Sequence, residues 1–234
     1  MHVALDRLNE AARLTDHGID IWLADSSRLP GDLIEALDAS ESERAKRMAS
    51  GELTRRFSMA RGLLRHVLAA YLDCARSDIA IDQLADERPS VRAGDVVFNL
   101  SHSNSRVAIG VQRGGSLGID IETVTGKRDE LTIARSAFGA QERAFLEQLT
   151  GPERSWHFLR LWTCREAVLK AVGSGWRDNR VLIAPSREGG YALASAPPGW
   201  GDLTLAEFKP GGGCVGAIAT TQHRPVIRRF EIAA

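Results

Sequence analysis

Cysteine is scarce in this chain, and its spacing excludes several kinds of protein. The 234 residues include three cysteines, Cys74, Cys164 and Cys214, which lie far apart, and no Cys-x-x-Cys pair occurs. A disulfide scaffold needs a denser set, and zinc ribbons or thioredoxin-like proteins need paired cysteines. The odd number and wide spacing favour free thiols in a reducing compartment, so we expect a cytoplasmic protein.

Net charge and long apolar runs are also missing. The 30 basic residues balance 30 acidic ones, which argues against a nucleic-acid partner whose phosphates must be neutralised. No stretch approaches the ~20 apolar residues of a membrane-spanning helix, and residues 1–15 lack the apolar region of a signal peptide. Because 44% of the residues are apolar, the chain has enough material for a folded core. We therefore expect a soluble protein with no membrane partner.

Several common catalytic motifs are absent as well. There is no Walker A motif, no Gly-x-Gly-x-x-Gly fingerprint, and no His-x-His or His-Glu-x-x-His spacing among the 6 histidines. Residues 114–118 do match Gly-x-Ser-x-Gly, the nucleophile elbow of serine hydrolases. That elbow needs a strand before the serine and a helix after it, whereas here the strand is expected after Ser116. A serine-hydrolase site is therefore not predicted.

Hydrophobic periodicity predicts an α+β fold. Amphipathic helices are grouped beside short strands, which is typical of α+β proteins rather than doubly wound sheets. The polar residues 101–105 are interpreted as a turn between two strands. The expected helices are 32–37, 40–48, 55–71, 131–149 and 155–172, and the expected strands are 19–23, 96–100, 107–111, 117–121, 181–183, 191–194, 203–208 and 215–220.

The predicted chain divides into two halves, residues 1–123 and 124–234, each with helices and a few strands. The segment Gly18-Ile19-Asp20-Ile21 recurs as Gly118-Ile119-Asp120-Ile121. Four common residues match by chance often enough that this repeat has little weight alone.

The segment at 118–122, Gly-Ile-Asp-Ile-Glu, is the first with evident chemistry. Alternate residues of a strand share a face, so Asp120 and Glu122 are expected to project together about 6 to 7 Å apart. Two neighbouring carboxylates repel each other unless a cation lies between them, and Mg²⁺ prefers such oxygen ligands together with water and phosphate. Taken alone, the pair is more often the solvated face of an edge strand.

The second segment is 162–170, Trp-Thr-Cys-Arg-Glu-Ala-Val-Leu-Lys, within an amphipathic helix. Glu166 and Lys170 are four residues apart and are therefore neighbours on one flank of the helix. An ordinary helical ion pair is the commoner explanation of any single Glu/Lys pair. Neither segment is decisive alone.

In combination, the two segments resemble the signature of the 4′-phosphopantetheinyl transferase superfamily, (V/I)-G-(I/V)-D-x-E followed by W-x-x-K-E-A-x-x-K. The chain is similar to the longer, Sfp-type branch over most of its length. Further matches occur in the family's order. They are the helix at 38–48, the helix at 55–65, Glu87-Arg88-Pro89 for the family's G-(K/R)-P, and Phe-Asn-Leu-Ser-His-Ser at 98–103.

This resemblance implies an enzyme that moves the 4′-phosphopantetheine arm of coenzyme A onto a serine of an apo acyl or peptidyl carrier protein, releasing 3′,5′-ADP. It implies Mg²⁺ held by Asp120, Glu122 and Glu166. Asp120, Glu166 and Lys170 are the expected catalytic residues, with Glu166 as general base and Lys170 on the pyrophosphate. The implied fold has two similar α+β halves with small antiparallel sheets and a pseudo-twofold, so that a monomer mimics a dimer.

The resemblance also assigns contacts to the nucleotide and phosphates of coenzyme A, in addition to Lys170: Arg44, Arg56, Arg88, Ser101 and His102. Two positions depart from the family pattern. Arg165 replaces the lysine before the glutamate, and because arginine does not release its proton at working pH, only a phosphate-binding role survives there. Glu41 stands where better-known relatives have a basic residue, which leaves Arg44 as the expected contact in that helix.

The implied carrier partner is an acidic helical domain. Since the chain has no net positive charge, a local patch must attract it, and Lys127, Arg128 and Arg135 are the candidates. Two alternatives remain open. One is a coenzyme A- or carrier-binding module without transfer activity, against which the intact acidic residues and Lys170 argue. The other is a Mg²⁺-dependent pyrophosphate hydrolase, in which water replaces the serine.

Overall fold

The computed structural model describes residues 1–82, 90–91, 94–124, 129–174, 180–186, 189–200 and 202–233. The chain forms two units, one of Met1–Gly114 with Pro225–Ala234 and one of Gly115–Arg224. The boundary expected after residue 123 therefore lies earlier, between Gly114 and Gly115. The last residues, expected in the second half, return to the first unit.

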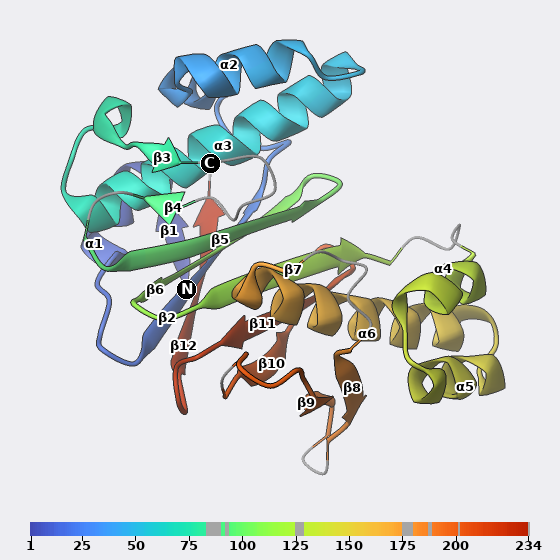
Figure 1. Cartoon of the computed structure of the whole chain (residues 1–234). Helices are drawn as coiled ribbons and strands as arrows, with labels where there is room; N and C mark the ends of the chain where they lie inside the picture. Colours follow the sequence, from blue (N-terminus) through green and yellow to red (C-terminus); the bar gives the residue numbers. More distant parts are fainter. Residues whose placement is uncertain are drawn as a thin grey trace. The chain divides into compact units, whose positions relative to one another are not determined.

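The first unit is built on a mixed five-stranded sheet with the order β1-β12-β2-β6-β5 (Figure 1). Strand β12 is parallel to both of its neighbours, β1 and β2, whereas β2, β6 and β5 are antiparallel to one another. Its elements are β1 (His2–Ala4), a 3₁₀ helix η1 (Leu5–Arg7), α1 (Leu8–Ala11), β2 (Gly18–Asp25), the 3₁₀ helix η2 (Gly31–Ala36), α2 (Ala39–Lys46), α3 (Gly51–Leu72), the 3₁₀ helix η3 (Arg76–Asp78), β3 (Ile81–Asp82), β4 (Ser90–Val91), β5 (Val96–Ser103), β6 (Arg106–Arg113) and β12 (Val226–Ala233).

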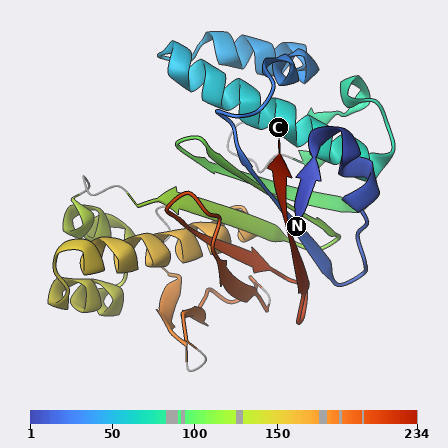
Figure 2. The same cartoon turned by 180° about the vertical axis from the view of Figure 1, so that it is seen from behind.

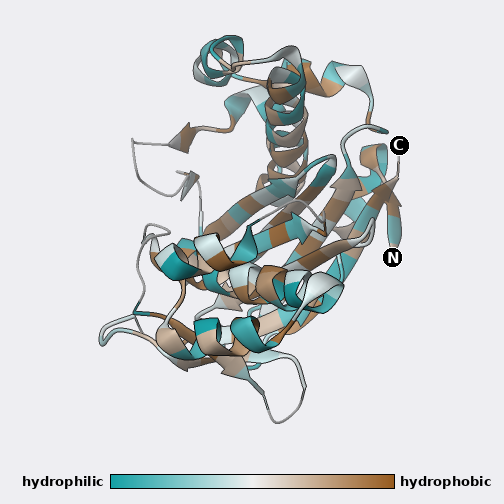
Figure 3. Cartoon of the chain, turned by 90° about the vertical axis from the view of Figure 1, so that its right-hand side faces the viewer, coloured by the Kyte–Doolittle hydropathy of each residue, from teal (hydrophilic) through white to brown (hydrophobic). Residues whose placement is uncertain are grey.

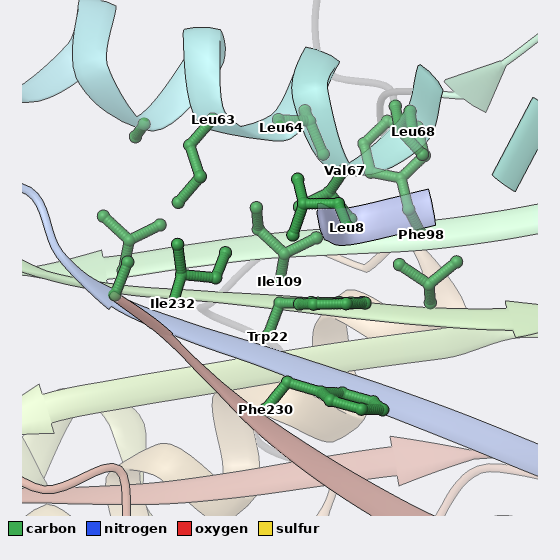
Figure 4. Packing of buried hydrophobic residues seen from close by; sticks show 14 of the residues in the cluster. Leu8, Trp22, Leu63, Leu64, Val67, Leu68, Phe98, Ile109, Phe230 and Ile232 are labelled. Atoms are coloured by element: carbon green, nitrogen blue, oxygen red, sulfur yellow. The ribbon is translucent and has the colours of Figure 1, made fainter. Parts of the chain in front are cut away.

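Helix α3 closes the core of this unit. Its apolar stripe of Leu63, Leu64, Val67 and Leu68 is fully buried and points toward the sheet, as Figure 4 shows. On the sheet, the ring of Trp22 stacks on that of Phe230 with their centroids 4.4 Å apart. Because β12 supplies Phe230, the core of the first unit depends on residues near the end of the chain.

The second unit has an antiparallel three-stranded sheet with the order β10-β11-β7 and a separate β8–β9 hairpin. Helix α6 runs along β7, and both Figure 1 and Figure 2 show this. The elements are β7 (Leu117–Thr123), α4 (Glu130–Ala137), α5 (Ala140–Gln148), α6 (Gly151–Val172), β8 (Leu182–Pro185), β9 (Tyr191–Ser195), β10 (Thr204–Phe208) and β11 (Cys214–Thr220).

The core of the second unit lies between α6 and the sheet. Val215, Ala217 and Ala219 alternate along β11 and pack in one cluster with α6 residues such as Phe158 and Val168. Such packing requires an amphipathic helix, and in Figure 3 the helices are a mixture of hydrophilic teal and hydrophobic brown residues. Most residues in the C-terminal half of α6 are buried, including Thr163 and Arg165.

The two units have the same order of elements. From β2 in the first unit and from β7 in the second, each continues through short helices to a 22-residue helix, and then has a small two-stranded sheet and two further strands. In the first unit β1, η1 and α1 come before β2. The three strands that correspond also pair alike, as β2-β6-β5 in one unit and β7-β11-β10 in the other. The predicted fold, two similar α+β halves, is confirmed, except that β12 makes the first sheet mixed. The pseudo-twofold between the halves stays a prediction.

Three local predictions were wrong. The expected helix 131–149 is two helices, because the chain is extended at Phe138 and Gly139 between α4 and α5. The expected turn 101–105 is shorter, since β5 continues to Ser103 and only Asn104 and Ser105 connect it to β6. Asn104 has a φ of 52°, a conformation that asparagine tolerates in two-residue hairpins. Strands β1 and β12 were not expected.

None of the described helices combines the length and the apolar character needed to cross a membrane.

Candidate active site

Strand β7 and helix α6 approach each other closely at Gly118. A Cβ atom at this position would lie 2.0 Å from the carbonyl oxygen of Ala167 and 2.5 Å from the amide nitrogen of Ala171. Only glycine fits there, because backbone atoms of α6 cannot move aside as a flexible side chain can. Since alternate residues of a strand share a face, Asp120 and Glu122 project on the same side as Gly118. This places Asp120 against α6.

Lys170 of α6 reaches across to the strand. Its Nζ donates to Oδ1 of Asp120 at 2.7 Å and to the carbonyl oxygen of Ile119 at 3.1 Å. Asp120 is buried, with 6% of its surface exposed, whereas Lys170 is only partly buried. The i,i+4 spacing of Glu166 and Lys170 thus serves a tertiary contact, because the ammonium group binds an aspartate on another element.

Glu166 brings a third carboxylate to the site. Its Oε1 is buried and has no hydrogen-bond partner in the described part of the chain. Burial is the main cause that raises the pKa of Glu166, and the negative charges of Asp120 and Glu122 raise it further. Lys170 and Arg165 act in the opposite direction. A buried carboxylate beside two others has a high free energy unless a cation joins it.

The three carboxylates do not form a ready-made metal centre. Among the described residues, no three aspartate, glutamate, histidine or cysteine side chains lie close enough to hold an ion by themselves. One oxygen of Asp120 already accepts the hydrogen bond from Lys170. The sequence-based metal set, Asp120, Glu122 and Glu166, is brought into electrostatic contact, but its joint coordination of one ion stays a prediction.

Arg165 does not point toward these carboxylates. Its side chain is completely buried, and its Nη1 donates to the carbonyl oxygen of Val181 at 2.8 Å. Burial raises the pKa of the nearby Glu142, and the charge of Arg165 acts in the opposite direction, as do the amide hydrogens of Gly139 and Ile183 that the Glu142 carboxylate accepts. The phosphate-binding role expected for Arg165 does not agree with this position.

A pocket in the first unit gathers two of the predicted nucleotide contacts. It has a volume of about 180 Å³ and is lined by residues of α2, α3 and β5, including Arg44 and His102. The guanidinium of Arg44 lies over the ring of Phe57, 5.2 Å from its centroid. Sequence reasoning missed the other lining residues, which are Phe57, Ala60, Arg61, Phe98, Asn99 and Leu100. The last three belong to the Phe-Asn-Leu-Ser-His-Ser motif and could have been found from it.

The remaining predicted contacts are not brought to this pocket. Arg56 forms an ion pair with Glu52 one turn earlier on α3, and it does not line the pocket. Ser101 is buried on β5 one residue from His102, so its side chain projects from the opposite face of the strand. Arg88 lies outside the described residues.

The contacts of Glu41 explain why an acidic residue stands where better-known relatives have a basic one. It is buried in the capping box of α2, and its carboxylate accepts hydrogen bonds from Nε of Arg61 at 2.5 Å and from Nε of Arg65 at 2.6 Å. A glutamate so enclosed cannot bind a phosphate. Arg44 remains the predicted contact of this helix, as the sequence analysis expected.

Comparison with known proteins adds independent evidence. A family model described as the 4′-phosphopantetheinyl transferase superfamily matches residues 116–194, a segment that contains both β7 and α6. The chain is 32% identical to the 4′-phosphopantetheinyl transferase HetI of Nostoc sp. over 197 residues, or 80% of each protein. The chain belongs to the 4′-phosphopantetheinyl transferase superfamily. This confirms the family and the class of enzyme predicted from the sequence.

The chain is also similar to other members of the superfamily over shorter stretches. The 4′-phosphopantetheinyl transferase psf-1 of Bacillus pumilus is 31% identical over 122 residues, which is 52% of this chain and 51% of that protein. A solved holo-(acyl-carrier-protein) synthase from Bacillus anthracis, in complex with CoA (3′,5′-ADP), aligns with 45% of this chain and 93% of its own at 17% identity and a TM-score of 0.39. That alignment is too distant to add evidence on the site.

The segment that matches the superfamily model contains Asp120, Glu122, Glu166 and Lys170. The predicted carrier-binding patch is only partly described. Lys127 and Arg128 lie outside the described residues, and Arg135 is exposed on α4, where its Nη2 donates to Oγ1 of Thr132.

Proposed function

We propose that this chain transfers the 4′-phosphopantetheine arm of coenzyme A to a serine of an apo acyl or peptidyl carrier protein and releases 3′,5′-ADP. The observation that supports this most is the arrangement on β7 and α6. A lysine is bound to one buried aspartate there, and the partly buried Glu166 beside them has a buried oxygen without a hydrogen bond in the described part of the chain. Such a group of charges suits a phosphoryl transfer, in which positioning and charge stabilisation provide most of the rate.

Mg²⁺ is the cofactor that these residues fit. Glu166 Oε1 is a buried acceptor without a hydrogen bond from the described residues, and the adjacent charges of Asp120 and Glu122 raise the pKa of Glu166. Mg²⁺ is commonly held by one or two carboxylates together with water and substrate phosphates, so it needs no complete protein cage. Asp120, Glu122 and Glu166 are the residues that would hold it, and the ion would neutralise charge on the pyrophosphate when bound.

The reaction forms one bond and breaks another. The serine oxygen of the carrier attacks the phosphorus next to the pantetheine arm, and the bond from that phosphorus to the oxygen of the departing 3′,5′-ADP breaks. Glu166 is the proposed acceptor of the serine proton, because its raised pKa makes it a better base than an exposed glutamate. Lys170 is partly exposed, with 29% of its side chain accessible, while its ammonium stays near Asp120, and from there it is proposed to contact a pyrophosphate oxygen.

The pocket of the first unit is proposed to bind the nucleotide end of coenzyme A. Its lining combines the cation of Arg44 and the ring of His102 with the aromatic side chains of Phe57 and Phe98. A phosphate is favoured by the first two groups, and an adenine ring stacks on aromatic residues or on guanidinium planes. We also propose that the enzyme acts as a cytoplasmic monomer, since its cysteines are free thiols and both units come from one chain.

The test is incubation of the purified protein with coenzyme A, Mg²⁺ and a panel of apo carrier domains, read by intact mass. We expect one phosphopantetheine to be added to the carrier, with loss of the reaction in EDTA and in a carrier whose acceptor serine is alanine. Release of 3′,5′-ADP without a carrier would support a hydrolase instead. Binding of coenzyme A without any release would support a binding module.

A further inference from the structure

Arg165 belongs to a buried connection between three elements of the second unit. It leaves α6 and donates from Nη1 to the carbonyl oxygen of Val181, directly before β8. Glu142 of α5 accepts the amide hydrogen of Ile183 at 3.0 Å and that of Gly139 at 2.7 Å. Both Arg165 and Glu142 are nearly or fully buried, and their acceptor and donor on the following segment, Val181 and Ile183, are two residues apart, so α5 and α6 are both bonded to the start of β8.

The first unit has a buried arginine at the corresponding position of its long helix. Arg65 lies 14 residues after Gly51 at the start of α3, and Arg165 lies 14 residues after Gly151 at the start of α6. Arg65 is also completely buried. It donates from Nε to Glu41 at 2.6 Å and from Nη1 to the carbonyl oxygen of Ile79 at 3.0 Å.

The surroundings of the two arginines correspond in part. Glu41 and Glu142 are each at N3 of the helix before the long one, where each accepts the amide hydrogen of the N-cap residue. Ile79 and Val181, whose carbonyl oxygens accept from the arginines, both follow the long helix. The residue after the arginine differs, however, because the first unit has His66 where the second has Glu166. An arginine that keeps this position in a unit without the catalytic carboxylate is not explained by contact with a phosphate.

The contacts on the two sides of α6 fix its rotation. On one side, Gly118 lets the backbone at Ala167 and Ala171 approach β7. On another side, Arg165 holds the helix to Val181. Successive residues of a helix point about 100° apart, so Arg165 can be bound to β8 while Glu166 faces Asp120. Rotation of α6 would break one contact or the other.

We propose that Arg165 is a positioning residue, which clamps α6 to the start of β8 through Val181, a segment that Glu142 of α5 holds at Ile183, and thereby keeps Glu166 beside Asp120. This proposal rests on the proposed function for the role of Glu166. It differs from the phosphate contact expected from the sequence, since the arginine acts through the helix and not on coenzyme A.

The variants for the test are Arg165→Met, Glu142→Gln, the double variant, and Arg165→Lys, with Arg65→Met as the matched control in the first unit. All are compared well below their thermal midpoints, so that each is folded. For Arg165→Met we expect kcat to fall by about tenfold or more, with KM for coenzyme A within about twofold of the wild type. Glu142→Gln should lower kcat in the same direction, and the double variant should be no worse than Arg165→Met, because both changes break one connection.

Arg165→Lys should recover part of the lost kcat, since it keeps the charge. Arg65→Met should lower the thermal midpoint without changing kcat per folded molecule. A rise of about tenfold in KM for coenzyme A in Arg165→Met, with Glu142→Gln silent, would show a phosphate contact and overturn the proposal. A lower thermal midpoint with unchanged kcat and KM would show a purely structural role and would also overturn it.

Amide hydrogen exchange separates this proposal from the proposed function. The clamp predicts faster exchange at Ile183 and along α6 in Arg165→Met than in the wild type, whether or not the protein transfers phosphopantetheine. If the wild type transfers nothing to any carrier, the proposed function fails while the exchange result still tests the clamp. Unchanged exchange in Arg165→Met would refute the clamp even in an active enzyme.

Discussion

The two units have an aspartate at the same position of corresponding strands, β2 and β7, but the two carboxylates have different partners. Asp20 on β2 is completely buried and binds the guanidinium of Arg228 through two hydrogen bonds of 2.7 Å, as well as the hydroxyl of Tyr71. Asp120 on β7 binds the ammonium of Lys170, which is partly open to solvent. Both carboxylate oxygens of Asp20 accept hydrogen bonds from the large side chains of Arg228 and Tyr71. Asp120 instead binds the ammonium of a lysine and lies near another carboxylate, Glu166. The same framework thus holds a saturated ion pair in one unit and the proposed catalytic group in the other.

The largest expected effect comes from exchanging these two aspartates for asparagine. Asp120→Asn should lower the rate of transfer by about 10³-fold or more, because a carboxylate is lost where charge must be balanced. Asp20→Asn should instead destabilise the fold by about 3 kcal/mol, since Arg228 loses its buried partner, and activity per folded molecule should be kept. Intact-mass kinetics and thermal melting of both variants provide the measurement. Equal loss of activity in the two variants would remove the contrast.

The next effect concerns the residues that follow the two buried arginines. Glu166→Gln should lower kcat by about 10²- to 10³-fold if Glu166 accepts the serine proton. It should also raise the thermal midpoint of the ligand-free protein at neutral pH. A carboxyl with a raised pKa favours the folded state at low pH, and that stability is lost as the pH rises through the folded pKa. The matched variant His66→Gln should leave kcat unchanged. A lower midpoint for Glu166→Gln would contradict the unfavourable burial of its charge.

The pH dependence of transfer sharpens the same point. Because the pKa of Glu166 lies above the 4.5 of an ordinary glutamate, the rate should already decline at a pH above that value as the carboxylate takes up a proton. Higher Mg²⁺ concentrations should shift this acid limb to lower pH, since a nearby cation favours the charged form. Profiles of kcat/KM from about pH 5 to about pH 9 at two Mg²⁺ concentrations test this. An acid limb that does not move with Mg²⁺ would assign it to another group.

The smallest expected effect concerns helix α2, where Arg44 is proposed to bind coenzyme A and Glu41 to stabilise the fold. Arg44→Ala should raise KM for coenzyme A by about tenfold, as expected for one lost charge-assisted contact. Glu41→Gln should leave KM unchanged and lower the thermal midpoint, because Arg61 and Arg65 lose their shared buried carboxylate. Titration calorimetry with coenzyme A and melting curves distinguish the two variants. An effect of Glu41→Gln on KM alone would place Glu41 in the nucleotide site after all.

Much of the fold and part of the site follow from local patterns. Alternation along β7 predicts that Asp120 and Glu122 share a face, and the helical period predicts that Glu166 and Lys170 are neighbours. These local patterns do not show which residue of α6 contacts which residue of β7. Lys170 binds Asp120 because Gly118 permits a close approach, and this is a property of two elements 50 residues apart. Tertiary contacts of this kind are not encoded in any single window of sequence.

The same reason explains the incorrect expectations. Arg165 and Glu41 look like surface charges in the sequence, because arginine and glutamate are rarely buried unless paired, and their pairing partners are distant. Strand β12 was missed since Arg228 and Arg229 interrupt its apolar pattern, and Arg228 is there to bind Asp20. The helix expected at 131–149 is interrupted at Gly139, whose amide is capped by Glu142.

The position of β12 has a consequence for how the chain is made. Its residues lie inside the first sheet, between β1 and β2, yet the ribosome adds them after every residue of the second unit. The second unit therefore has all of its strands while the first still exposes an unpaired edge along β2. During synthesis that edge is open to pairing with another nascent chain. Removal of residues 226–233 should make the protein aggregate through its N-terminal part, although the segment deleted is at the opposite end.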